Sequence, residues 1–591
     1  MSFFESIRIK LGSLDALPVL AALGFISGIL AGGVIVLFRL FIESGFVLWH
    51  SNDSAGDFEG TPWWFRLILP TFGGIVVGYI LHKVGKHYRQ VGVGHVLERM
   101  TFHQGYLNWR NALVQFLIGG LTIATGQSVG KEGPGIHLGS ASGSWLGQQM
   151  KLPNNSIRIL VGCGTAAAIS ASFNTPLAGV IFAMEVVMME YTVSSFIPLI
   201  LSSVSAAIMS RIVFGNNVAF IVPSLDLHSL WEIPHFIILG LVIGSIASLF
   251  IKGTAVVSAK ASQWSTWLKC SIAGLSVGII ALAAPQIMGI GYDTVNSALH
   301  GSLPLQILAI AFIGKLLATI ICSGLSLPGG AIGPSMFIGA MAGGIIGSFG
   351  AWLLPDYASE YAFYSMVGMA TMMSAILQAP LAALMALLEL TNNPNVLLPG
   401  MIAVVVSNLV VTQVFKQSSI LHSQLRAKGL ELRINPLSQF LRSVGVAGLM
   451  ERKLSVHEKL ISYQEAEKML ATTPRWILVR QDKVPTSLLA ANDLARYVLE
   501  LKENQAAKDA EENEGIARPI EKEIDLLAIP ADRQDIASVY LQANLEEALD
   551  TMERENVEAI YIFRTTAPTA DKIYGILTKE QIESHYSYKA K

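Results

Sequence analysis

The sequence predicts an all-α polytopic membrane domain, built from two repeats that we expect to be inverted and followed by a cytoplasmic α/β domain. Three observations predict this fold class. Of the 591 residues, 52% are hydrophobic and only 14% are charged, whereas soluble globular proteins carry about 25% charged residues. The first two thirds of the chain alternate apolar runs with short polar breaks and contain an internal repeat. From about residue 450 onward, charged residues are dense.

Composition also excludes several classes of protein. The net charge of −2 gives no electrostatic basis for binding nucleic acid. The three cysteines lack the spacing of a zinc site or a disulfide framework and are expected to be buried thiols: Cys163, Cys270 and Cys322. No HExxH-like spacing is present, so we expect neither an enzyme nor a metal site made by His95, His103 and His137.

Apolar stretches follow one another through the first part of the chain, at 17–42, 63–82, 111–124, 157–188, 196–214, 235–251, 271–288, 305–322, 335–354, 361–388 and 397–415. Several are shorter than the roughly 20 residues that span a bilayer, or are broken by glycine or proline. Broken helices are tolerated in a membrane where their ends are buried in protein or line a polar cavity. Their backbone N–H groups can hold an anion there, which favours a transporter or channel.

The internal repeat is the most specific feature of the sequence. GKEGPGIHLGSASGSWLG starts at Gly130 and GAIGPSMFIGAMAGGIIG starts at Gly330, and both follow GxxGPxxxxGxxxGxxxG. Downstream, NTPLAGVIFAMEV (174–186) resembles QAPLAALMALLEL (378–390). Two related halves, about 15–215 and 230–420, predict a transporter with its site between them, near the middle of the membrane.

Three glycine-rich segments precede predicted helices: GVGHVLE (92–98), GKEGP (130–134) and GGAIGP (329–334). Glycine lets the backbone approach an ion closely, and the N-terminal end of a helix is positive. These helix starts therefore favour an anion, and they disfavour the alternative of a cation transporter.

The charged loops predict the orientation of the chain in the cell membrane. Basic residues follow the second and the last apolar stretch: Lys83, Lys86 and Arg89, then Lys416, Arg426 and Lys428. Positive charge in short loops marks the cytoplasmic side. The charged region 431–591 follows directly, so we expect it in the cytoplasm, as two similar units at about 450–500 and 525–588 joined by a charged linker at about 503–525.

The three glycine-rich segments are similar to the signature regions of the CLC family of chloride channels and anion/proton exchangers, usually written GSGIP, GKEGP and GxFxP. The similarity covers about residues 15–430, and the two C-terminal units resemble the CBS repeats of larger members. It implies a membrane domain over 1–430, a homodimer with one pathway per subunit, and chloride or another anion as substrate. Protons would act as gating or coupled ligands, with no required cofactor. The CBS pair would either bind adenine nucleotide or serve as a packing module.

The resemblance assigns Glu132, in GKEGP, to the family's gating glutamate. Its carboxylate would occupy an anion site when charged and leave it on protonation or on competition by an anion. The alternative from the residues alone is a surface glutamate stabilised by a helix N-terminus. An ionisable residue in an apolar segment is costly and indicates function. The expected anion pathway consists of Val93, Gly94, His95, Lys131, Gly133, Pro134, Gly330, Ala331, Ile332 and Ile420.

Several positions depart from the family pattern. Val93 replaces the usual serine, and Ile420 falls where an anion-coordinating tyrosine is expected, so both hydroxyl ligands are absent. Ile332 replaces a phenylalanine. His95 is either a hydrogen-bonded structural histidine or a titratable cation near the inner pathway.

One departure bears on proton coupling. Exchangers of the family commonly carry an internal glutamate immediately after the position of Glu185, and this chain has Val186 there. Valine cannot carry a proton, which favours passive conduction. The alternative is a proton-coupled exchanger, specialised for chloride or for another anion. Glu185 itself is expected to be structural, as a helix cap or at the subunit boundary.

Overall fold

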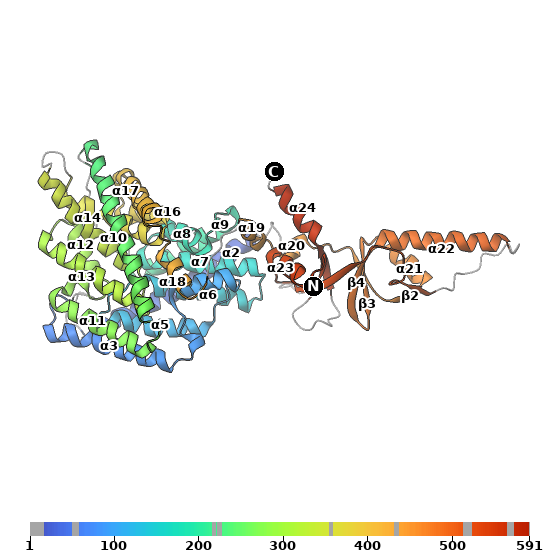
Figure 1. Ribbon diagram of the computed structural model, residues 1–591, viewed down its shortest axis with the longest axis horizontal. Helices are drawn as coiled ribbons and strands as arrows, with labels where there is room; N and C mark the ends of the chain where they lie inside the picture. Colours follow the sequence, from blue (N-terminus) through green and yellow to red (C-terminus); the bar gives the residue numbers. More distant parts are fainter. Residues whose placement is uncertain are drawn as a thin grey trace. The chain divides into compact units, whose positions relative to one another are not determined.

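The structure is a computed structural model that describes residues 17–49, 58–215, 220, 227, 229–353, 359–430, 436–511, 523–563 and 573–589. The described residues form two compact units (Figure 1). One is helical and contains Leu17–Met150 and Ile157–Leu430, and the other contains Lys151–Ser156 and the α/β region from Pro436 onward.

The helical unit consists of two series of helices. The first series is α2 (Leu17–Trp49), α3 (Trp63–Lys83), η2 (Lys86–Tyr88), α4 (Gly92–Phe102), α5 (Trp109–Ala124), α6 (Glu132–Gln149), α7 (Asn154–Phe173), α8 (Pro176–Phe182), η3 (Ala183–Met188) and α9 (Val193–Phe214). The second is η4 (Leu230–Glu232), α10 (Ile233–Lys260), α11 (Thr266–Ala283), η5 (Pro285–Ile287), α12 (Tyr292–Leu299), α13 (Leu305–Gly324), α14 (Ile332–Leu353), α15 (Tyr361–Leu377), α16 (Pro380–Thr391), η6 (Pro394–Val396), α17 (Leu397–Leu409), η7 (Val410–Val414) and α18 (Ile420–Ala427).

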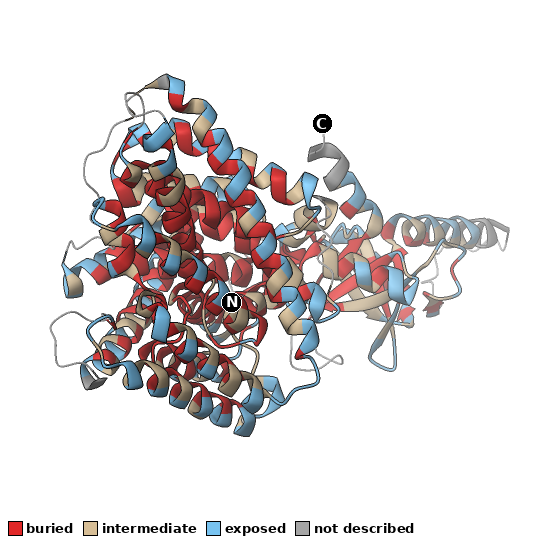
Figure 2. Cartoon of the chain, turned by 60° about the vertical axis from the view of Figure 1, so that its left-hand side comes forward, coloured by how far each residue is buried: buried red, intermediate tan, exposed pale blue. Residues whose placement is uncertain are grey.

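Length and composition make this unit a membrane domain. Within the described residues, nine helices are long and apolar enough to cross a bilayer. Figure 2 shows buried residues concentrated inside the unit, while the outward faces of many helices carry exposed residues. Large apolar side chains are common on those faces, as with Leu37 of α2 and Ile279 of α11, which suits contact with lipid.

Two of the predicted apolar stretches, 157–188 and 361–388, each form two helices. The break falls at Asn174 in one and at Gln378 in the other, where φ is 60° and 55°. Left-handed backbone cannot continue a right-handed helix. The proline two residues later then opens the next helix, since its fixed φ suits the first helical position.

The two series form inverted repeats that interlock. α2 packs against α9 and α10 packs against α17, at equivalent places in each half. α3 of the first half packs along α11 of the second. At the centre, Gly130 and Gly330 pair in antiparallel fashion, so equivalent segments of the two halves meet directly and run in opposite directions.

The later glycines of the repeat motif serve helix packing. A Cβ at Gly139 would meet the carbonyl of Gly164 on α7, and a Cβ at Gly339 would meet the carbonyl of Gly368 on α15. The next pair, four residues on, lies equally close to the same neighbouring helices. Small residues at this spacing let helix backbones approach closely in a membrane.

The α/β unit contains two similar halves. The first comprises β1 (Leu454–Glu458), β2 (Leu460–Ser462), α21 (Tyr463–Ala471), β3 (Trp476–Gln481), β4 (Val484–Ala490) and α22 (Ala491–Glu511). The second comprises β5 (Glu523–Asp525), β6 (Gln534–Tyr540), α23 (Leu545–Glu555), β7 (Ala559–Phe563), β8 (Ile573–Thr578) and α24 (Lys579–Lys589). α19 (Pro436–Ser443) and α20 (Val446–Leu449) precede them.

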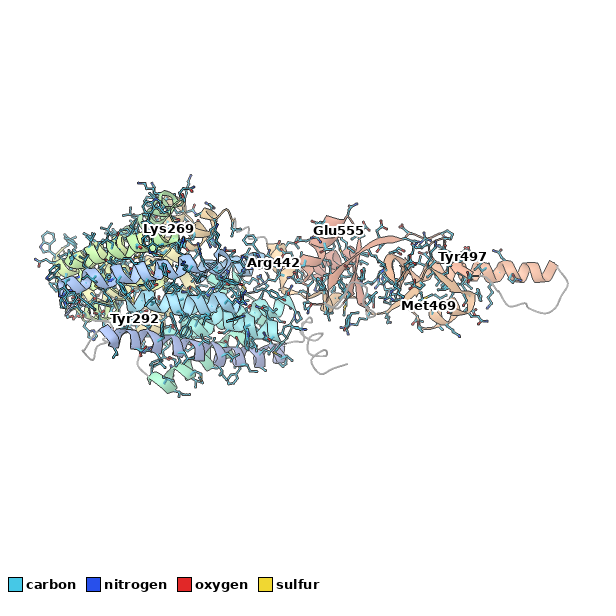
Figure 3. All side chains as sticks on the ribbon, turned by 90° about the horizontal axis from the view of Figure 1, so that it is seen from below. Lys269, Tyr292, Arg442, Met469, Tyr497 and Glu555 are labelled. Atoms are coloured by element: carbon cyan, nitrogen blue, oxygen red, sulfur yellow. The ribbon has the colours of Figure 1, made fainter. Side chains whose placement is uncertain are left out.

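One sheet joins the halves in the order β1-β3-β4-β6-β7-β8, with parallel pairs β1–β3 and β6–β7. β2 and β5 form a separate antiparallel pair. The first helix of each half begins with a capping box, at Ser462 and at Asn544. Met469 and Tyr497, labelled in Figure 3, belong to the apolar core of the first half.

Regular structure extends into both ends of the segment 503–525, which the sequence predicts to be a linker. Residues 503–511 continue helix α22, and 523–525 form strand β5, while 512–522 lie outside the described residues. The segment KENQAAKDAE is rich in alanine, glutamate and lysine, which are good helix formers. Charge density alone therefore does not distinguish a solvated helix from a linker.

Candidate functional site

The centre of the membrane domain is a junction between the two glycine motifs. Gly130 and Gly330 exchange two backbone hydrogen bonds, each with an N–O distance of 2.8 Å. A Cβ at Gly133 would lie 2.6 Å from the Cα of Gly330, so only glycine fits at this contact. The junction brings the start of α6, at Glu132, to the start of α14, at Ile332.

Glu132 is almost completely buried at this junction, with 1% of its surface exposed. Its Oε2 accepts a hydrogen bond from the backbone N–H of Gly333 at 3.1 Å. Its Oε1 accepts a hydrogen bond from the hydroxyl of Tyr292. The carboxylate of one repeat therefore caps the positive N-terminus of a helix in the other. This contradicts the alternative of a surface glutamate.

Tyr292, the first residue of α12, is a site residue that the sequence did not predict (Figure 3). Its ring lies 4.9 Å from that of Phe220, and the Nζ of Lys131 lies 5.2 Å from its centroid. A signal for it exists in the repeat. GYDTV at 291–295 matches GVGHV at 92–96 in its opening glycine and its valine, and both glycines have positive φ. Tyr292 is thus the counterpart of Val93.

Lys315, on α13, is the second residue that was missed. It is fully buried, and its ammonium donates hydrogen bonds to the carbonyls of Ile287 and Gly289, each at 2.9 Å. A buried charge needs such compensation. The contacts hold the segment that leads into α12, and they thereby position Tyr292.

A cavity of about 350 Å³ opens beside the junction. Six of the predicted pathway residues line it: Val93, Gly94, His95, Gly330, Ala331 and Ile420. Among its described lining residues are two full cations, Arg89 and Lys428, and no acidic side chain. Lys428 lies 3.6 Å from Glu98, which offsets part of its charge. The wall remains electropositive, which attracts anions.

The other four predicted pathway residues surround Glu132. Lys131 precedes α6, Gly133 and Pro134 lie in its first turn, and Ile332 opens α14. Gly330 belongs to both groups, because it lines the cavity and packs on Gly133. The predicted residues therefore form two adjoining clusters, one around the carboxylate and one around the cavity.

His95 is hydrogen-bonded through both ring nitrogens. Its Nδ1 lies 2.9 Å from Nε2 of His137, and its Nε2 accepts a hydrogen bond from Nε of Arg99 at 3.2 Å. An acceptor at Nε2 requires a neutral imidazole that carries its proton on Nδ1. This arrangement agrees with a structural histidine and disfavours a cation at this position.

Glu185 and Glu389 form a reciprocal pair of helix caps. Glu185 accepts hydrogen bonds from the backbone N–H groups of Leu381 and Ala382, in the first turn of α16. Glu389 accepts equivalent bonds from Leu177 and Ala178, in the first turn of α8. Each repeat thus caps a helix of the other.

Val186 lies next to Glu185 within η3, is 7% exposed, and offers no group that can titrate. No group of His, Cys, Asp and Glu side chains within the described ranges could hold a metal ion. The three cysteines are buried and unpaired thiols.

Comparison with known proteins agrees with this architecture. Residues 73–412 match the family model described as voltage gated chloride channel. A putative chloride channel protein, ClcB-like, from Ralstonia nicotianae is 31% identical over 64% of this chain and 89% of that protein. The H(+)/Cl(−) exchange transporter ClcA of Vibrio cholerae is 26% identical over 69% of this chain and 90% of that protein.

Solved structures share the fold. The crystal structure of a eukaryotic CLC transporter covers 98% of this chain and 99% of that chain, with 16% identity and a TM-score of 0.58. The family model spans more than half of the sequence, and the matched residues include the junction, the buried carboxylate and most of the cavity wall. The chain is therefore a multi-pass membrane protein that belongs to the CLC family of anion channels and transporters, not an enzyme.

Proposed function

We propose that this protein is a passive anion channel gated by Glu132. The observation that supports the proposal is the position of the carboxylate. It accepts hydrogen bonds from the backbone N–H of Gly333 and from the hydroxyl of Tyr292, and a bound anion would accept the same two bonds. When the carboxylate is charged it competes with an anion for these donors and closes the pathway. Protonation, or a competing anion, displaces it and opens the pathway into the electropositive cavity.

Passive conduction is favoured by Val186, because an apolar side chain at the internal position cannot relay protons. The alternative is a proton-coupled exchanger of chloride or another anion. It is favoured by the similarity to a Vibrio cholerae protein named as an H(+)/Cl(−) exchange transporter. In that case Glu132 would carry the proton and another route would replace the internal glutamate.

Flux through purified protein in liposomes tests the two mechanisms. We expect chloride to move down its own gradient, with a reversal potential that follows the chloride gradient alone and does not change when a pH gradient is imposed. Chloride moved uphill by an imposed proton gradient would reject the channel and select the exchanger.

We further propose a homodimer whose α/β unit is a cytoplasmic pair of CBS repeats. Two halves of similar order, each with a parallel strand pair and a capped helix, support the CBS assignment.

The exposed apolar side chains of Leu177 and Leu381, on the packed helices α8 and α16, support a contact face between the two subunits in the membrane. Cysteines at these two positions should cross-link between subunits, and their failure to do so would reject this face.

Adenine nucleotide is the candidate ligand of the CBS pair, and a packing role is the alternative. Titrating the full-length protein with ATP and AMP while following thermal unfolding separates the two. A concentration-dependent rise in Tm supports nucleotide binding. An unchanged Tm at millimolar nucleotide leaves packing as the role.

A further inference from the structure

Gln115, on α5, is a buried amide whose polar atoms have no hydrogen-bond partner among the described residues. Only 1% of the residue is exposed, and neither Nε2 nor Oε1 bonds to a protein atom there. Buried amides are nearly always paired, and an unpaired one lowers stability. The position therefore favours a ligand that completes the bonding of this amide.

Gln115 is one of the residues that line the cavity. It also lies against the start of α6. A Cβ built on Gly119 would be 2.5 Å from the Gln115 Nε2 and 3.2 Å from the Cβ of Pro134. The amide thus lies where the cavity approaches the helix that begins with Glu132.

The surroundings of the amide select an anion. α4 begins at Gly92 in the cavity wall, so the positive end of that helix faces the same space. The guanidinium of Arg89 donates to the carbonyls of Val84 and His82, at 2.8 and 2.7 Å, and has no acidic partner in these contacts. Among the described lining residues the fully charged side chains are cations and none is acidic, so the wall favours an anion over a cation.

We propose that Gln115 is a specificity-determining ligand of the transported anion. Its amide N–H groups donate to the anion, in place of the hydroxyls that Val93 and Ile420 do not supply, and its Oε1 accepts from a water of the ion's hydration shell. A cavity of about 350 Å³ holds an ion together with several waters, since a water occupies about 30 Å³. The site therefore binds a partly hydrated monovalent anion. This inference rests on the proposed anion conduction.

The effect of Gln115→Leu on Tm, measured with and without chloride, distinguishes an anion ligand from a glutamine with a structural role. Leucine has a similar volume and no polar atom to leave unpaired. In a buffer whose only anion is gluconate, the variant should have a Tm equal to or above that of the wild type. When chloride is added, the Tm of the variant should rise less than that of the wild type, because the amide N–H donors to the anion are absent.

The experiment measures the Tm of purified full-length protein in gluconate buffer as chloride is added, and chloride efflux from liposomes. For Gln115→Leu we expect the chloride midpoint of the Tm rise to increase about tenfold or more, as for loss of a hydrogen bond to a charged group. Gln413→Leu is the matched control, since Gln413 is exposed on η7 and does not line the cavity. It should keep the wild-type midpoint.

Two results would overturn the proposal: an unchanged chloride midpoint in Gln115→Leu, or a loss of Tm in gluconate with the midpoint retained, which would make Gln115 structural. Either result, with wild-type efflux intact, leaves anion conduction standing. A wild-type protein that moves no chloride and shows no chloride-dependent Tm overturns conduction and this inference together.

Discussion

At the residue scale, the site depends on how one carboxylate is held. Glu132 accepts one hydrogen bond from the backbone of the opposite repeat and one from a tyrosine side chain. The backbone N–H of Gly333 is present whatever the side chain at that position, whereas the hydroxyl donor requires a tyrosine at position 292. If Glu132 is the gate, as we propose, the stability of the closed state depends on a residue 160 positions away in the chain.

Replacing that tyrosine should weaken the closed state. Tyr292→Phe keeps the ring among its aromatic neighbours and removes only the donor to Glu132. A hydrogen bond to a charged group contributes about 1.5–3 kcal/mol. Chloride efflux from liposomes at neutral pH should therefore rise by about tenfold or more. Efflux equal to the wild type would show that the hydroxyl does not hold the gate.

Most residues around the carboxylate could be predicted because they lie in motifs with a physical signature. The glycine-rich segments before the helices predicted Gly94, Gly133 and Gly330. Tyr292 follows two glycines, at 289 and 291, that are spaced as in GVG at 92–94, and this weaker match to the repeat is its signal in the sequence. Gln115 could not be predicted, because an amide in an amphipathic helix is ordinary until the absence of a partner is seen.

At the element scale, helix ends make both the site and the contacts between repeats. The starts of α6 and α14 meet at Gly130 and Gly330, and α8 and α16 each receive a glutamate cap from the other repeat. The glycine-rich motifs predicted where α6 and α14 begin, but not the starts of α8 and α16. The breaks at Asn174 and Gln378 were not predicted, since left-handed backbone at a residue other than glycine has a weak sequence signal.

The glycine junction gives a prediction about packing. Gly330→Ala would place a Cβ 2.5 Å from the backbone nitrogen of Gly133, whereas Gly33→Ala, on α2, meets nothing within 4 Å. Overpacking typically costs about 1–3 kcal/mol. Thermal unfolding in detergent should show a lower Tm for Gly330→Ala only, and efflux should fall with it. Equal Tm values for the two variants would argue against a close-packed junction.

The reciprocal caps give a second prediction. Glu185→Gln and Glu389→Gln each remove a charge and one acceptor from a helix N-terminus, and each should cost about 1 kcal/mol of stability. Glu360→Gln is the matched control, because Glu360 precedes α15 without a side-chain cap bond. The free energy of unfolding of each of the three variants, compared with that of the wild type, measures the contribution of the caps. A control as destabilised as the cap variants would contradict this role.

At the scale of the whole molecule, two halves related in sequence line one cavity together. Hydropathy and the 200-residue offset predicted the two halves and the charged C-terminal region. The inversion was expected from the general pattern of two-repeat transporters and not from composition, because the composition of an apolar helix does not show in which direction it crosses a membrane. In the α/β unit, the dense charge of the segment 503–525 predicted a linker and not the end of α22 or strand β5.

The pH dependence of chloride efflux, compared between the wild type and Glu132→Gln in liposomes, tests the role of the buried carboxylate most directly. Glutamine has nearly the same shape and carries no charge to compete for the anion donors. We predict that the wild type is slow at neutral pH and faster in acid, while Glu132→Gln is fast at both and shows no pH response. A variant that keeps the pH response of the wild type would show that the gate lies elsewhere.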